Sequence, residues 1–159
     1  MTHAPSRSED HRGRVVAGGV LLGIGVMAAV DEIIFHQLLR WHHFYDGSTP
    51  AIGIVSDGLL HTGELFALVA GIFLLLDGRR RQVLRPISAW SGFFLGAGGF
   101  QVFDGLIDHK VLRIHQIRYG VELLPYDLAW NIAGVVLFAI GVVLYLRSRR
   151  TRPAVASGR

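Results

Sequence analysis

Four long apolar runs constrain the fold of this chain more than any other feature. They cover residues 15–30, 65–76, 87–103 and 128–146. The last two runs contain no charged residue and approach the ~20 residues that an α-helix needs to cross a bilayer. The first two reach that length if one helix continues through Asp31 and Glu32 and another begins near Ile52.

The sequence therefore predicts an all-α, polytopic membrane protein. We expect four transmembrane helices, packed as a four-helix bundle within one domain over residues 15–147. Their expected positions are about residues 15–40, 51–76, 86–109 and 126–147. Residues 1–14 are polar, and we expect them to be disordered in the cytoplasm. The first apolar run is not interpreted as a signal peptide, because it continues into a polar segment that recurs in mid-chain.

That polar segment is an internal repeat. Asp31–His43 (DEIIFHQLLRWHH) returns as Asp104–Gln116 (DGLIDHKVLRIHQ), displaced by 73 residues from 31 to 104. The shared positions are Asp31/Asp104, His36/His109, Leu39/Leu112, Arg40/Arg113 and His42/His115. In the preceding apolar runs, Gly19, Gly23 and Gly25 match Gly92, Gly96 and Gly98. The chain is therefore predicted to contain two helical hairpins, repeated in parallel about an axis along the membrane normal.

The basic residues indicate how the hairpins are oriented. Of the 16 lysines and arginines, twelve lie before the first helix, in the second connection or from Arg147 through the tail. The other four lie in the first and third connections. By the positive-inside rule, both termini are then cytoplasmic, in the inner membrane of a bacterial cell. The net charge of +4 is explained in this way, and no nucleic-acid partner is expected.

Carboxylates and imidazoles gather where helices 1 and 3 end and helices 2 and 4 begin, which places them in the outer leaflet. Ionisable groups inside a bilayer normally face the bundle interior and have partners. Side chains of this kind from several helices at one depth are typical of a metal site in a bundle core. The candidate metal ligands are His36, His61, His109, Glu32, Asp57, Glu64, Asp31, Asp104, Asp108, His42 and His115. We expect Asp127 and Asn131 to orient these ligands by hydrogen bonds without binding the metal themselves.

The chemistry of the ligands limits the metal. The chain has no cysteine, which excludes thiolate sites and disulfides. Imidazole with carboxylate suits Zn, Fe, Mn or Cu(II), and the sequence does not choose among them. A bound metal would polarise water or a substrate while a carboxylate moves protons. Arg40 and Arg113 would then hold an anionic substrate or lipid headgroup, and the activity itself, if any, stays open.

Other interpretations of the polar cluster are a small proton or metal-ion transporter, haem ligation by His36 and His109, or an assembly subunit of a membrane complex, including a homo-oligomer. The pairs Asp31/Arg40 and Asp104/Arg113 would be ion pairs in a purely structural interpretation. The repeat is also asymmetric, since Glu32 is matched by Gly105 and His61 by Asn131. We therefore expect one asymmetric site or two unlike sites.

Three strings carry a resemblance to a known family. They are DEIIFHQLLRWHHFYD at 31–46, SDGLLH at 56–61 and FDGLIDHKVLRIHQIR at 103–118. The chain resembles, over nearly all of residues 15–147, an uncharacterised family of bacterial predicted membrane proteins (domain of unknown function 2243). The resemblance implies an integral membrane protein of the bacterial cell envelope, and it implies no activity.

Overall fold

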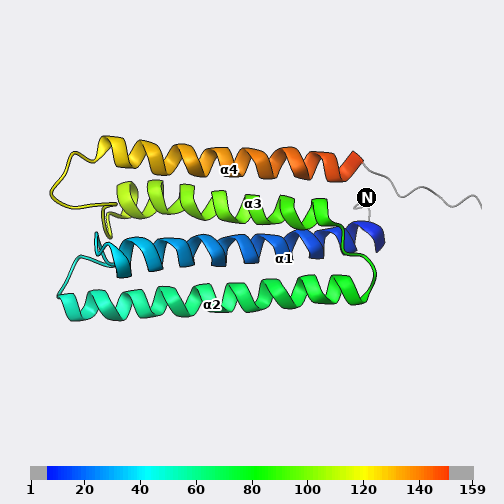
Figure 1. Ribbon diagram of the computed structural model, residues 1–159, viewed down its shortest axis with the longest axis horizontal. Coiled ribbons are helices and arrows are strands. Elements are labelled where there is room, and N and C mark those ends of the chain that lie inside the picture. Colours follow the sequence, from blue (N-terminus) through cyan, green and yellow to red (C-terminus); the bar gives the residue numbers. More distant parts are fainter. Residues whose placement is uncertain (1–6, 151–159) are drawn as a thin grey trace, which may run out of the picture.

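The computed structural model describes residues 7–150, and within that range it is all-helical, with no strand. The elements in chain order are α1 (Arg7–Val30), η1 (Asp31–Leu38), α2 (Pro50–Arg80), α3 (Pro86–Phe103), η2 (Asp104–Leu112) and α4 (Leu124–Arg150). The four long helices lie side by side, with α1 and α3 in the middle and α2 and α4 outside them (Figure 1).

Three stretches of helix in the described range are long and apolar enough to cross a membrane. They are His11–Leu38, Pro50–Arg80 and Leu124–Arg150. The prediction of long apolar helices is confirmed for these three. The fourth expected span, α3, is not among these three; it is an 18-residue helix that is rich in glycine and carries Gln101. It packs against both α1 and α4.

Glycines allow the two central helices to approach closely. A Cβ on Gly23 of α1 would overlap the carbonyl oxygen of Phe93 in α3, and a Cβ on Gly96 of α3 would overlap that of Val20 in α1. These two contacts are equivalent, because Gly23 matches Gly96 and Val20 matches Phe93 at the same 73-residue offset. Small residues at such crossings bring backbones together in lipid, where dispersion contacts replace the hydrophobic effect.

The outer helices repeat one arrangement as well. Gly25 of α1 packs on Leu68 of α2, and its counterpart Gly98 of α3 packs on Phe138 of α4. On the outer helices, Gly71 packs on Leu22 and Gly141 packs on Leu95. The glycines that match in the sequence therefore make matching contacts in space.

The repeated acid–histidine segments form π-helices, η1 and η2, where regular α-helix was expected. A π-helix bonds residue i to i+5 and so has a wider turn than an α-helix. Side chains five residues apart then lie on one side, which they do not in an α-helix. Asp31 and His36 are spaced in this way, as are Asp104 and His109.

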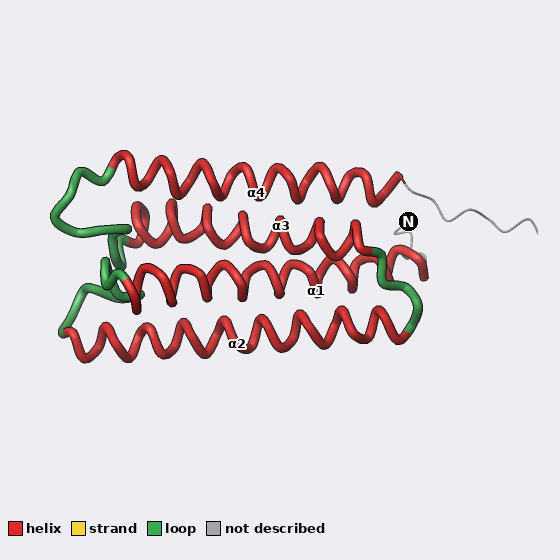
Figure 2. Tube along the Cα trace, viewed as in Figure 1, coloured by secondary structure: helices red, strands yellow, loops and turns green. Residues whose placement is uncertain are grey.

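Each π-helix ends in a sharp reversal of the chain. Arg40 has φ 51° and Arg113 has φ 54°, so both adopt the left-handed conformation that costs a non-glycine residue free energy. The Trp41 N–H donates to the Phe35 carbonyl at 2.9 Å, and the Ile114 N–H donates to the Asp108 carbonyl at 3.1 Å. The residues after each arginine are thereby turned back toward the helix ends, as the loops at that end show (Figure 2).

The observed bounds differ from the predicted ones mainly at the ends. α1 begins at Arg7, well before residue 15, and α2 continues to Arg80. Helices extend past their apolar runs because backbone hydrogen bonding does not depend on lipid. Residues 1–6, which we expected to be disordered, lie outside the described residues, and so do residues 151–159 of the basic tail.

Candidate metal centre

Four buried histidines form a row at the end of the molecule where α1 and α3 pass into η1 and η2. The ring centroids of His36 and His42 are 4.5 Å apart, those of His42 and His115 are 4.7 Å apart, and those of His115 and His109 are 4.6 Å apart. None of the four residues is more than 5% exposed. Two of them come from π-helices and two from the reversed loops, so the row depends on both features.

Two of these histidines are fixed by reciprocal hydrogen bonds between the loops. His42 Nδ1 lies 2.9 Å from the Ile117 carbonyl oxygen, and His115 Nδ1 lies 2.9 Å from the Phe44 carbonyl oxygen. A carbonyl only accepts, so each Nδ1 carries the proton and each Nε2 carries a lone pair. Burial, with added repulsion from neighbouring imidazoles, lowers the pKa of His42 to about 2 and keeps its ring neutral.

The Nε2 atoms of all four histidines are buried and have no hydrogen-bond partner within residues 7–150. Carboxylate oxygens stand close to three of them. Asp31 Oδ2 is 3.5 Å from His36 Nε2, while Asp104 places Oδ2 3.3 Å from His109 Nε2 and Oδ1 3.3 Å from His115 Nε2. Two ligands bound tetrahedrally to one ion at about 2.0–2.1 Å are roughly 3.3–3.4 Å apart.

Three sets of residues in this region have their ligand atoms within 4.8 Å of one another. They are Asp31/His36/His42, His42/His109/His115 and Glu32/His36/Asp57, and every member is buried. Neutral imidazole with carboxylate is a donor set for first-row transition metals. The arrangement can therefore hold such an ion.

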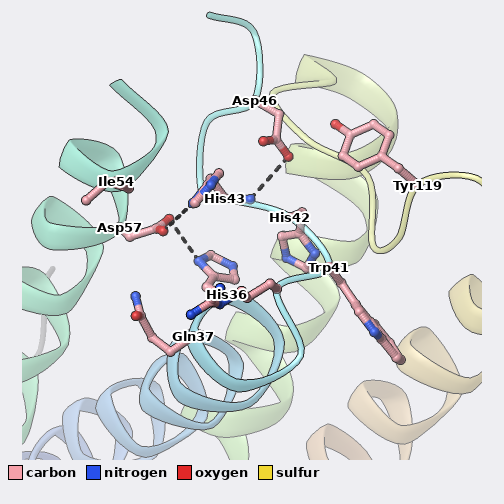
Figure 3. A pocket seen from close by; sticks show the side chains of 10 residues that line it. His36, Gln37, Trp41, His42, His43, Asp46, Ile54, Asp57 and Tyr119 are labelled. Atoms are coloured by element: carbon pink, nitrogen blue, oxygen red, sulfur yellow. Dashed lines mark hydrogen bonds and ion pairs between the residues drawn. The ribbon is translucent and has the colours of Figure 1, made fainter. Parts of the chain in front are cut away.

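Acidic side chains from α2 and η1 hold His36 from its other side. His36 Nδ1 lies 3.1 Å from Asp57 Oδ1 in a hydrogen bond (Figure 3). The same nitrogen lies 2.9 Å from Glu32 Oε2. Asp57 also accepts from the Phe44 N–H at 2.7 Å and lies 2.6 Å from His43 Nδ1. A carboxylate on the second ring nitrogen is the usual way to orient a metal-binding histidine and raise its basicity. Asp57 thus ties α2, the loop and His36 together.

His109, which matches His36 in the repeat, has no carboxylate hydrogen-bonded to its Nδ1 within residues 7–150. His109 Nδ1 is 4.0 Å from Asp127 Oδ1 and makes no hydrogen bond within the described residues. Asp127 instead forms an ion pair with Lys110, at 2.6 Å. Asn131 donates to the Asp127 carbonyl at 2.8 Å and its side chain packs against Gly105. Asp57 in α2 and Asp127 in α4 are 70 residues apart, as Gly71 and Gly141 are, yet only Asp57 hydrogen-bonds a row histidine.

A cavity of about 540 Å³ opens onto the first half of the row. Its lining residues are His36, Gln37, Arg40, Trp41, His42, His43, Asp46, Ile54, Asp57 and Tyr119. Seen in Figure 3, His36, His42 and His43 face this space from one side and Asp46 and Tyr119 from another. His109 and His115 do not line the cavity, so the two ends of the row differ in access.

The comparisons with known proteins give a family. The family described as "Predicted membrane protein (DUF2243)" matches residues 18–148. The chain belongs to this family of predicted membrane proteins. No curated protein and no solved structure matches it. The match covers both hairpins, so the row of histidines in this DUF2243 protein lies wholly inside the family region.

The structure brings together most of the residues that the sequence singled out. Those in the three compact sets are Asp31, Glu32, His36, His42, Asp57, His109 and His115, and Asp104 contacts two of them. His61 and Glu64 pair with each other at 2.5 Å, outside the sets, and the His61 side chain is 51% exposed. Asp108 is buried, and its carbonyl bonds the chain after η2. Arg40 lines the cavity, whereas Arg113 does not.

Sequence reasoning gave little weight to His43, which packs on Asp57 and the cavity. It also missed Gln37, which donates to Glu32 at 2.7 Å, and the carbonyls that hold His42 and His115. One signal was present, since Gln37 follows Glu32 by five residues just as His36 follows Asp31. Two pairs at this interval, both on one segment, favour a π-helix over an α-helix.

Proposed function

We propose that this DUF2243 protein is a bacterial inner-membrane protein that binds a transition metal at a histidine–carboxylate centre. In this proposal the chain crosses the bilayer four times as two parallel hairpins, with both termini in the cytoplasm. The centre then faces the periplasmic side. The arginine-rich connection between α2 and α3, at the end of the molecule opposite the centre, supports this orientation (Figure 1).

The observation that carries the proposal is the set of four buried Nε2 atoms without hydrogen-bond partners in the described range. A buried acceptor left unsatisfied costs about 1–3 kcal/mol, so native structures rarely tolerate several together. Metal cations bound at the row would satisfy these nitrogens and the adjoining oxygens of Asp31 and Asp104. They would also offset the cost of placing carboxylates at membrane depth.

The packing favours a bare ion over haem. His36 and His109 each contact the rings of both His42 and His115, with centroid distances between 4.5 and 6.2 Å. Those two rings fill space that a flat porphyrin between His36 and His109 would need. Zn, Fe, Mn and Cu(II) all suit this donor set. The adjoining cavity gives water or a small molecule access, which suits a metalloenzyme or a metal-handling factor.

The test is metal content of the detergent-purified protein. We expect stoichiometric transition metal after equilibration with Zn²⁺ and desalting, measured by elemental analysis. His42→Ala and His115→Ala should each lower the content by at least half. His11→Ala, a histidine near the start of α1 and away from the row, is the matched control and should bind as the wild type does.

Protein that elutes as one symmetric species and carries no metal after this treatment would overturn the proposal. Equal metal in the wild type and in both row variants would overturn it too, since the ion would then be bound elsewhere.

A further inference from the structure

We propose that the centre holds two metal ions, one for each half of the row, and that only the first is open to exchange. This inference rests on the proposed metal binding. The first ion is bound by Asp31, His36 and His42, and the second by Asp104, His109 and His115.

Ring geometry separates the two halves. The imidazoles of His42 and His115 stack with an interplanar angle of 5°. The lone pair of an imidazole nitrogen lies in the plane of its ring, so a metal ion binds in that plane. Two stacked, parallel rings occupy separate planes, and one ion cannot lie in both. His42 and His115 therefore bind different ions, so of the compact set His42/His109/His115 only His109 and His115 share one.

Within each half the geometry suits a shared ion. The rings of His36 and His42 meet at 71°, and those of His109 and His115 meet at 81°. Centroid distances of 4.5 and 4.6 Å suit two imidazoles on one ion. Metal–nitrogen distances of about 2.0–2.1 Å give a centroid separation of roughly 4.5 Å at a right angle and roughly 5.2 Å at the tetrahedral angle. A carboxylate adjoins each pair, Asp31 in the first half and Asp104 in the second.

The ions are inequivalent because their surroundings differ. His36 and His42 line the cavity, and Asp57 and Glu32 support His36 from behind. No ligand of the second ion lines that cavity. In metalloproteins an open position is typical of a reactive ion and a closed shell is typical of a structural one. The first ion is thus the reactive one, and the second holds η2 and the loops together.

The experiment measures metal stoichiometry and release. Wild-type protein equilibrated with Zn²⁺ should contain two ions per chain. A strong chelator should remove one quickly and the other at least 10-fold more slowly. His36→Ala should retain one ion that leaves only slowly, whereas His109→Ala should retain one that leaves quickly. Asp77→Asn, in the last turns of α2 at the end of the molecule away from the row, is the matched control and should retain both ions.

A spectroscopic measurement on the wild type decides the question even where a variant does not fold. Two Mn²⁺ ions in neighbouring sites, about 3.5–4 Å apart or somewhat more, give a spin-coupled paramagnetic resonance spectrum. A fully loaded protein with one ion per chain and an uncoupled spectrum would overturn this inference and leave the proposed metal binding intact. A protein that binds no metal would overturn both.

Discussion

Asp57 is the side chain that most distinguishes the two halves of the centre. It bonds His36, His43 and the Phe44 N–H, whereas its counterpart Asp127 is drawn to Lys110. A carboxylate hydrogen-bonded to a ligand imidazole raises the basicity of that imidazole and fixes its orientation. The same residue type at matching positions therefore has unequal effects, because a neighbouring lysine competes in one half only.

Asp57→Asn should weaken the binding of the first ion about 10-fold or more, the usual effect of losing such a carboxylate. Asparagine keeps the size and one acceptor but loses the charge. Competition against a chelator of known affinity measures the change. Asp127→Asn is the control and should have little effect, since Asp127 does not hydrogen-bond His109. Equal losses in the two variants would contradict the assigned role.

The close packing of α1 against α3 requires glycine, whereas the outer face of α2 has room for a side chain. A Cβ on Gly23 would overlap backbone atoms of α3, whereas a Cβ on Gly63 would meet no atom within 4 Å. A methyl group forced between two backbones moves both helices, since a backbone cannot rotate aside as a side chain can.

Gly23→Ala should therefore destabilise the protein by about 1–3 kcal/mol. Gly63→Ala should be neutral or stabilising by about 0.5–1 kcal/mol, because alanine loses less conformational entropy in a helix. Thermal unfolding in detergent measures both. A Gly23→Ala variant as stable as Gly63→Ala would show that α1 and α3 are not in this close contact.

The helices and the matched glycines could be predicted because they depend on local properties, which are apolar length and the spacing of small residues. The π-helices could not be predicted by assuming regular α-helix. That assumption puts Glu32 beside His36 but rotates Asp31 away, and it leaves His42 beyond the helix end. Only the wider turn and the left-handed Arg40 bring Asp31, His36 and His42 together. His61 was chosen for its spacing from Asp57, yet its side chain is half exposed.

The whole molecule is polarised along its length. The loops that follow η1 and η2 lie at one end, with the histidine row, and the α2–α3 connection lies at the other (Figure 1). The absence of cysteine from the sequence makes this arrangement easy to test, because any introduced thiol is the only one.

Ser48→Cys and Glu122→Cys, in the two loops near the row, should react with a membrane-impermeant maleimide in intact cells. Gln82→Cys, in the opposite connection, should react only after the membrane is opened. The positive-inside distribution of arginine is the physical reason. Labelling of all three in intact cells, or of Gln82→Cys alone, would contradict the proposed orientation.

The reciprocal bonds from His42 to the Ile117 carbonyl and from His115 to the Phe44 carbonyl make each hairpin depend on the other. Each hairpin supplies the carbonyl that sets the tautomer of the other's histidine, so a solitary hairpin would leave its own imidazole untethered.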